Sequence, residues 1–298
     1  MNGRIEFAAP LRAWLLQNID GGVPPGPLAR QLVQEGVAAA VASALVQAVW
    51  HARARGVEPP AGAIDPAQVQ AAHYAYGTPR LAARDGVRVS LRLERPMLAV
   101  LEGVLSADEC DALIAQAKPR LAASTLVDPG SGADVASMAR TSQGMFFRPQ
   151  ENALVERIDR RLAALMGLPI ENGEGLQVLR YAPGAQSNPH FDFLMPVNDA
   201  NRASLQRSGQ RVSTLVMYLN DPPQGGETVF PEAGVTVTPR KGSAVYFEYC
   251  NDAGQLDPLS LHAALPVAGG EKWVATRWMR QRAFRPAAAP AMPALEAR

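Results

Sequence analysis

The stretch His190-Phe191-Asp192-Phe193 places an imidazole and a carboxylate two positions apart in the chain. On a β-strand, residues i and i+2 point to the same face, so His190 and Asp192 would share one face and the two phenylalanines the other. A histidine and a carboxylate side by side can bind a metal ion. Because such short combinations also arise by chance, the pair alone is weak evidence, and the other histidines must decide its meaning.

Of the remaining histidines, His51 and His73 lie in the N-terminal part of the chain, whereas His262 lies in its strand-rich part. Two histidines and one carboxylate form the facial triad of non-haem Fe(II) oxygenases, which leaves coordination positions open for a cosubstrate and dioxygen. No cysteine belongs to the set, which argues against a structural zinc site. The sequence therefore predicts that His190, Asp192 and His262 bind a metal ion, with ferrous iron as the metal.

A candidate cation for an anionic cosubstrate follows the last of these ligands. Lys272 opens the stretch "KWVATRWMR", ten residues after His262 and just beyond a Gly-Gly turn. Most lone lysines are solvated. This one is followed by three apolar residues, and a buried ammonium needs an anion to offset its desolvation. We therefore expect Lys272 to reach into the same cavity as the metal.

The elements that must position these side chains are two helices and a series of short strands. "SADECDALIAQAKPRLAAS" predicts a helix that begins with a capping box of Ser106 and Glu109, and "ENALVERIDRRLAALMG" predicts a second. The predicted strands lie in "GLQVLRYAPG", "RVSTLVMYLND", "GVTVTP", "SAVYFEYC" and "KWVATRWMRQR". This order favours an α+β fold with a double-stranded β-helix (jelly-roll, cupin-like) core and supporting helices.

The N-terminal part has a different pattern, which divides the chain into three parts. Up to about residue 55 the apolar periodicity predicts three helices, the first with Leu11, Trp14, Leu15 and Ile19 on one stripe. The Pro- and Gly-rich "GVEPPAGAIDPAQ" predicts a linker. We expect a helical N-terminal segment and linker over 1–80, the main domain over 81–284, and a disordered, low-complexity tail over 285–298.

Composition excludes some classes of partner and of location. The 298 residues carry 29 basic and 28 acidic side chains, so bulk charge predicts neither nucleic acid nor a membrane surface as partner. The N-terminus lacks the hydrophobic region of a secretory signal, and no apolar stretch reaches the length of a membrane span. Two cysteines fit a reduced environment more simply than a disulfide. We therefore expect a cytoplasmic protein.

From about residue 97 to 282 the chain resembles the prolyl 4-hydroxylase family of Fe(II)- and 2-oxoglutarate-dependent dioxygenases. Several motifs occur in the same order as in the family. The matching stretches are "LSADECDALIAQAKPRLAASTLVD", "RTSQGMFF", "LQVLRYAPG", "PHFDF", "STLVMYLND", "GGETVFPEAG" and "LHAALPVAGGEKWVATRWMR". A lone His-x-Asp is far less specific than this series. The main domain would then be an Fe(II)/2-oxoglutarate dioxygenase domain.

The resemblance implies a role for each candidate residue. The three predicted metal ligands match the iron ligands, and Lys272 matches the lysine that pairs with the distal carboxylate of 2-oxoglutarate. Tyr181 and Thr214 match hydroxyl groups around the same carboxylate, and Trp278 matches an aromatic ring at the cosubstrate end of the barrel. Without the neighbouring motifs these three would be read as core or strand residues.

The implied reaction is 4-hydroxylation of a prolyl residue in a peptide or protein, with succinate and CO2 as coproducts and ascorbate to restore oxidised iron. One departure weakens the assignment of proline: Ser187 stands where the family commonly has a tyrosine, three residues before the first iron ligand. The alternatives are hydroxylation of another residue or of a free amino acid, and a catalytically silent cupin-like binding protein. The intact ligands and Lys272 argue against the last.

Other stretches suggest how a substrate is bound. The polar stretch "MPVNDANRASLQRSGQR" predicts a loop, and its length and three arginines are typical of a lid over an acidic peptide. Arg140 and Glu174 lie in family-like stretches that could border a peptide groove. The N-terminal helices resemble ubiquitin-associated-type modules through "LVQEGV" and the alanine-rich helix after it, which would make them a protein-interaction module. We favour the alternative that they pack on the main domain.

Overall fold

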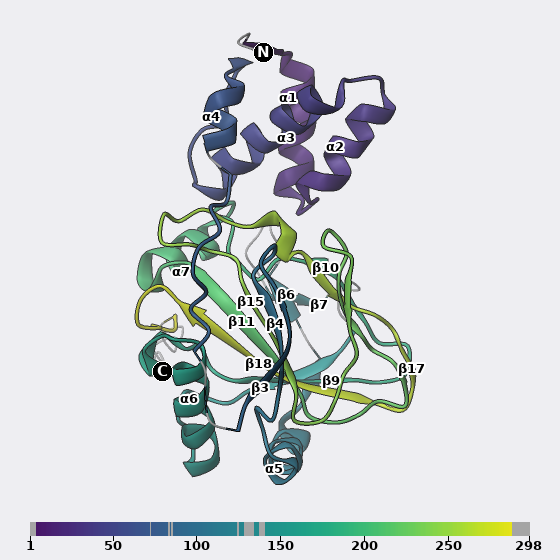
Figure 1. The fold of residues 1–298 in the computed structure, drawn as a ribbon, viewed down its shortest axis with the longest axis vertical. Helices are drawn as coiled ribbons and strands as arrows, with labels where there is room; N and C mark the ends of the chain where they lie inside the picture. The colour runs from purple at the N-terminus through teal and green to yellow at the C-terminus, as the bar shows by residue number, and fades with distance from the viewer. Residues whose placement is uncertain are drawn as a thin grey trace, which may run out of the picture.

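The computed structural model describes residues 4–71, 73–82, 84, 86–123, 125–127, 134–136 and 141–287. Its N-terminal part is the helical module, residues 4–71, which lies at one end of the molecule (Figure 1). The module consists of β1 (Ile5–Phe7), α1 (Ala9–Asp20), α2 (Pro25–Gln34), α3 (Ala39–Ala54), β2 (Gly62–Ile64) and α4 (Pro66–Ala71), with β1 and β2 paired antiparallel. The three predicted helices are α1, α2 and α3.

The main domain is built on a large antiparallel sheet. Its eight strands follow the spatial order β3-β4-β15-β11-β18-β9-β8-β5. Their bounds are Arg88–Leu93 (β3), Leu98–Glu102 (β4), Ala244–Glu248 (β15), Arg211–Tyr218 (β11), Lys272–Arg280 (β18), Gln177–Tyr181 (β9), Gln143–Phe146 (β8) and Ala122–Ala123 (β5). The strands predicted around residues 177–181, 211–218, 244–248 and 272–280 are all present.

A smaller antiparallel sheet of order β10-β16-β13-β14 lies across from the large one. Its strands are Ser187–His190 (β10), His262–Ala264 (β16), Thr228–Phe230 (β13) and Val235–Val237 (β14). Two further pairs are β12 (Gln224–Gly225) with β17 (Val267–Gly269), and β6 (Thr125–Val127) with β7 (Asp134–Ala136). The two facing antiparallel sheets form the predicted jelly roll.

Three longer helices support this core. α5 (Ala107–Ala117) begins with the predicted capping box, because the Ser106 hydroxyl accepts from Glu109 N and the Glu109 carboxylate accepts from Ser106 N. α6 (Ala153–Leu165) buries one apolar face and is capped by Asn152. These two helices lie at the end of the molecule away from the helical module, and α7 (Asp199–Ser208) lies nearer to it (Figure 1). None of the described helices is both long and apolar enough to cross a membrane.

Two predicted loops are ordered elements. The polar stretch read as a loop contains α7, because Asn198 caps the helix by accepting from Asn201 N at 2.8 Å. Part of the predicted linker folds back on the helical module as β2 and the start of α4, where Asp65 accepts from Ala67 N. Ile64 is buried there, and the burial of its side chain stabilises this stretch against the helical module despite its Pro and Gly content.

The predicted tail lies outside the described residues from residue 288 onward. The first residue of the predicted tail, Arg285, contacts the main domain, because its backbone N donates to Ser208 Oγ at 2.9 Å. Cys110 and Cys250 are both free and buried. The helical module shares one apolar core with the main domain, so it packs on that domain as we favoured above. The division of the chain near residue 80 stays a prediction.

Candidate active site

A cavity lies between the two sheets, and alternate residues of several strands line it. From β18 come Lys272, Val274, Thr276 and Trp278, and from β9 come Gln177, Leu179 and Tyr181. Both series have the period of two that puts strand side chains on one face. The smaller sheet and the chain next to it supply Ser187, His190, Asp192, Thr228, His262, Ala263 and Ala264. The cavity thus brings together all three predicted metal ligands, Lys272, Tyr181 and Trp278.

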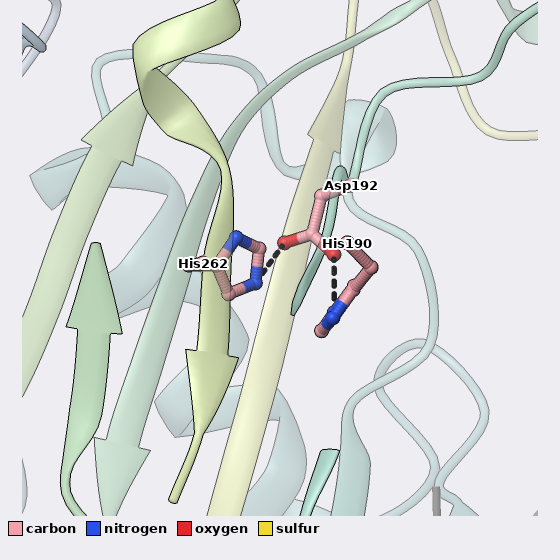
Figure 2. Close-up of side chains that lie close together, drawn as sticks. All are labelled: His190, Asp192 and His262. Carbon is pink, nitrogen blue, oxygen red and sulfur yellow. Dashed lines mark ion pairs between the residues drawn. The ribbon is translucent and has the colours of Figure 1, made fainter. Parts of the chain in front are cut away.

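The three predicted metal ligands converge at this cavity (Figure 2). His190 and His262 are cross-strand partners of β10 and β16, so their imidazoles stand side by side. His190 Nε2 lies 3.7 Å from Asp192 Oδ1, and His262 Nε2 lies 3.7 Å from Asp192 Oδ2. The three ligand atoms all lie within 4.8 Å of one another. One metal ion can therefore contact all three.

Both imidazoles are held in the tautomer that a metal ligand needs. His190 Nδ1 lies 2.8 Å from the carbonyl oxygen of Asn188, and His262 Nδ1 lies 3.0 Å from that of Ser260. A carbonyl oxygen only accepts, so each Nδ1 carries the proton and each Nε2 keeps its lone pair. Both lone pairs belong to the atoms that approach Asp192. This arrangement fits a divalent metal ion bound by nitrogen and oxygen.

Asp192 is held by groups that keep it ionised. Thr214 Oγ1 donates to Asp192 Oδ2 at 2.7 Å, and Tyr249 Oη lies 2.9 Å from the same Thr214 oxygen. Burial tends to raise the pKa of Asp192, but the positive charges of the two histidines when they are protonated, the charge of Arg211 and the hydrogen bond from Thr214 together hold it below its usual value. The carboxylate is therefore charged at neutral pH and ready to bind a cation.

Lys272 is buried, and no carboxylate of the described residues pairs with it. Its side chain is 2% exposed, and its ammonium lies 5.4 Å from the ring centroid of Tyr181 and 5.7 Å from that of Tyr218. Burial lowers the pKa of Lys272 to about 7, and among the described residues Glu227 is the charged group that opposes this effect. A buried ammonium beside two aromatic rings, with no paired carboxylate among the described residues, fits an anionic ligand that enters the cavity.

Thr228 is a candidate site residue that the sequence did not reveal. It lines the cavity, and its hydroxyl accepts from Tyr218 Oη at 2.9 Å beside the lysine. Gly226, in the same segment, has a φ of 74° and leaves room for Lys272, whose Cδ would lie 3.0 Å from an added Cβ. The matching motif "GGETVF" contains both residues and was the available signal.

The structure corrects the predicted role of Thr214 and places Trp278 in the wall of the cavity. Lys272 pairs with Tyr181 across β18 and β9, whereas Trp278 pairs with Thr214 across β18 and β11. Six residues of strand, roughly 20 Å, separate the two positions along β18. Thr214 therefore cannot bond the carboxylate that Lys272 would bind, and it holds Asp192 instead. Trp278 lines the cavity at its end far from Lys272.

Of the two residues expected at a peptide groove, the structure describes Glu174, which lies in a buried ion-pair network. Glu174 is buried, and its carboxylate accepts from Arg211 at 2.7 and 2.8 Å and from Arg280 at 3.1 Å. Arg211 also donates to the carbonyl oxygen of Asp192 and lies 4.3 Å from the ring centroid of Trp278. Arg140 lies outside the described residues.

Comparisons with known proteins agree with this geometry. Residues 176–280 match the 2OG-Fe(II) oxygenase superfamily. The chain is 44% identical to prolyl 4-hydroxylase 1 of Arabidopsis thaliana over 203 residues, which is 63% of this chain and 70% of that protein. It is 37% identical to prolyl 4-hydroxylase 5 of the same plant over 209 residues, or 64% and 70% of the two chains.

Among solved structures, the 2OG complex of a viral collagen prolyl hydroxylase from Paramecium Bursaria Chlorella virus-1 matches with 30% identity and a TM-score of 0.48. The match covers 61% of this chain and 95% of that one. The jelly roll, the triad and the superfamily match define the class of protein, an Fe(II)- and 2-oxoglutarate-dependent dioxygenase. Within that class, the similarity to the plant enzymes shows that the chain belongs to the prolyl 4-hydroxylase family.

The buried lysine predicts that binding of 2-oxoglutarate takes up a proton. Burial lowers the pKa of Lys272 to about 7, so above that pH the free protein carries mostly neutral lysine. A carboxylate beside it favours the charged form and raises the pKa again. Affinity for 2-oxoglutarate should therefore fall as pH rises above about 7, by up to about tenfold per pH unit.

Isothermal titration at pH 8 in two buffers of different ionisation enthalpy measures this proton uptake. We expect close to one proton taken up per site in the wild type and none in Lys272→Met, which keeps the length of the side chain. Equal heats in both buffers for the wild type would show that Lys272 stays charged in the free protein.

Proposed function

We propose that this protein hydroxylates a prolyl residue at the 4-position within a peptide or protein. The observation that carries the proposal is the cavity that joins the triad to the buried Lys272, in a chain 44% identical to a plant prolyl 4-hydroxylase. Dioxygen, 2-oxoglutarate and the prolyl C–H bond would yield hydroxyproline, succinate and CO2. The two oxygen atoms would end on hydroxyproline and on succinate.

Each residue of the site would have a separate role in this reaction. When bound by the triad, iron supplies the activation of dioxygen that attack on an unactivated C–H bond requires. The backbone carbonyls of Asn188 and Ser260 fix the two imidazoles, and Thr214 fixes the carboxylate. Lys272 would bind the distal carboxylate of 2-oxoglutarate, and the apolar walls would exclude water. Ascorbate, which keeps iron reduced in this family, is proposed here as well.

The substrate would approach from the side of His190. The side chain of His190 is 43% exposed, whereas that of His262 is 7% exposed. Ser187, which lines the cavity on the same strand, leaves more room than a tyrosine would. Free proline carries an ammonium and a carboxylate, and among the described lining residues Lys272 is the cation, already assigned to the cosubstrate. A peptide lacks these charges at its internal prolines.

We therefore predict that peptides are hydroxylated at proline and that free proline is a weak substrate. The arginines of α7 give no reason to expect acidic residues beside the target proline, because their side chains already have partners within the chain. Arg202 binds Asp199 and the carbonyl oxygen of Pro196, and Arg207 donates to the carbonyl oxygen of Arg285. Matched proline-containing peptides and free proline should be incubated with iron, 2-oxoglutarate and ascorbate. Mass spectrometry then locates the added oxygen and its ring position.

Three results would argue against the proposal in different ways. Hydroxylation of free proline with peptides untouched would overturn the peptide substrate. Oxygen on lysine or asparagine would overturn proline as the target and leave the iron chemistry intact. Binding of 2-oxoglutarate without succinate from any substrate would favour the catalytically silent binding protein.

A further inference from the structure

The helical module contacts the chain segment that carries a metal ligand. Trp50 of α3 is 2% exposed, and its ring centroid lies 6.4 Å from that of Phe191 and 6.0 Å from that of Phe193. The two phenylalanine rings stack on each other at 4.5 Å. They flank Asp192 in the sequence, so Trp50 packs on both neighbours of the carboxylate ligand. The module and the metal site therefore meet at one aromatic cluster.

A continuous series of contacts leads from this cluster to the carboxylate itself. The ring of Phe193 lies 6.0 Å from that of Tyr249, and Tyr249 Oη lies 2.9 Å from Thr214 Oγ1. Thr214 in turn donates to Asp192 Oδ2 at 2.7 Å. A shift of Phe193 would thus disturb both the backbone next to Asp192 and the hydroxyl pair that orients its carboxylate.

Strand pairing does not hold this ligand in place. β10 ends at His190, two residues before Asp192, so the ladder to β16 fixes the histidines but not the aspartate. Close packing of aromatic rings on both sides limits the conformations open to such a segment. In this protein the ring on the outer side of the cluster is supplied by the helical module.

Two other contacts fix the module against the same region. Arg30 of α2 forms an ion pair with Glu232 at 3.1 Å, in the turn between β13 and β14. Gly56, just after α3, lies against Pro196, whose Cγ would be 3.1 Å from an added Cβ. Because β13 pairs with β16, the strand of His262, the module borders the chain segments of both sides of the triad.

We propose that the helical module is part of the metal site and that Trp50 is a positioning residue for Asp192. This role rests on the metal-binding function of the triad, because Trp50 acts through Phe191 and Phe193 and touches no ligand atom. Loss of groups that orient a metal ligand typically costs about 10–100-fold in metal affinity. We expect a loss in that range when the indole is removed.

The test is the affinity of the full-length protein for manganese(II), measured from the spin resonance signal of free metal ions. Trp50→Ala should bind manganese about 10–100-fold more weakly than the wild type. Trp50→Phe, which keeps a ring in the cluster, should recover most of the affinity. If Trp50→Ala is insoluble, Trp50→Leu keeps apolar volume without a ring and should show the same weakening.

The matched control is Trp14→Ala, which removes an indole of equal size from α1 of the same module. Within the described residues, Trp14 makes no ring contact with Phe191 or Phe193 and is only partly buried. It should lower thermal stability and leave manganese affinity unchanged. Manganese affinity equal to that of the wild type in Trp50→Ala would overturn the proposal.

The outcome is separable from that of the proposed function. A wild type that binds manganese and 2-oxoglutarate but hydroxylates no prolyl peptide would refute the substrate and leave the role of Trp50 standing. Conversely, prolyl hydroxylation with a metal affinity insensitive to Trp50 would refute only the positioning role.

Discussion

His262→Ala and Asp192→Ala should each abolish metal binding and succinate formation while the protein stays folded. The three ligand atoms lie within 4.8 Å of one another, and removal of one leaves two ligands, too few to define the facial geometry. We expect turnover of 2-oxoglutarate to fall by more than about 10³-fold, equivalent to about 4 kcal/mol of lost transition-state stabilisation. Succinate release and bound metal should be measured on the same samples.

The fold should tolerate Asp192→Ala for a structural reason. In Asp192→Ala the hydroxyl of Thr214 keeps Tyr249 Oη as its partner, so no buried hydroxyl is left unpaired. Matched controls are His73→Ala, a half-buried histidine outside the cavity, and Asp199→Ala, an exposed aspartate at the start of α7. Wild-type turnover in either ligand variant, with both controls active, would remove the triad as the metal site.

The sequence predicted two members of the triad, His190 and Asp192, from local spacing, and the third, His262, from its place in the strand-rich part and from the family motifs. The spacing of two in "PHFDF" predicts a strand with His190 and Asp192 on one face, and both side chains do line the cavity, although β10 ends at His190 and Asp192 lies just beyond the strand. The capping box of α5 is equally local, since it spans four residues. Signals of this length can be recognised in a single sequence, whereas the approach of His262 to His190 depends on the pairing of β10 with β16.

The roles that depend on register could not be predicted in the same way. Thr214 and Thr228 are both strand threonines, and nothing in their own segments says which one lies near Lys272. The pairing of β18 with β9 and β11 decides the matter, since it sets Lys272 opposite Tyr181 and Trp278 opposite Thr214. Register is a long-range property that turn lengths and packing determine together.

Contacts between segments that lie far apart in the sequence could not be predicted either. α7 was read as a loop because its polar residues show no apolar stripe, yet the cap at Asn198 and bonds to the C-terminal segment stabilise it. Trp50 lies in the alanine-rich helix α3, and the sequence of that helix does not indicate a partner for it. Its contact with Phe191 and Phe193 joins positions about 140 residues apart, and no spacing rule reaches that far.

Lys272→Ala should raise the Michaelis constant for 2-oxoglutarate strongly and leave metal binding intact. Truncation of one partner of a buried charge pair costs roughly 2–5 kcal/mol, which corresponds to about 30- to 4,000-fold in affinity. The pKa of Lys272 is about 7 before the anion binds. Above that pH the lysine must first be protonated, and the free energy of this protonation weakens the binding of 2-oxoglutarate. The measurement therefore belongs below pH 7, where the lysine is mostly charged before the anion binds.

Three comparisons separate the charge from the shape of the cavity. Lys272→Met keeps most of the volume and should lose nearly as much affinity as Lys272→Ala if charge dominates. Lys241→Ala removes a surface lysine that pairs with Asp111, and it should leave the constant unchanged. A shorter 2-oxo acid such as pyruvate has no distal carboxylate, so its weak binding should not depend on Lys272. A constant for 2-oxoglutarate that is equal in the wild type and Lys272→Met would mean that its distal carboxylate binds elsewhere, because no other charge is changed in that variant.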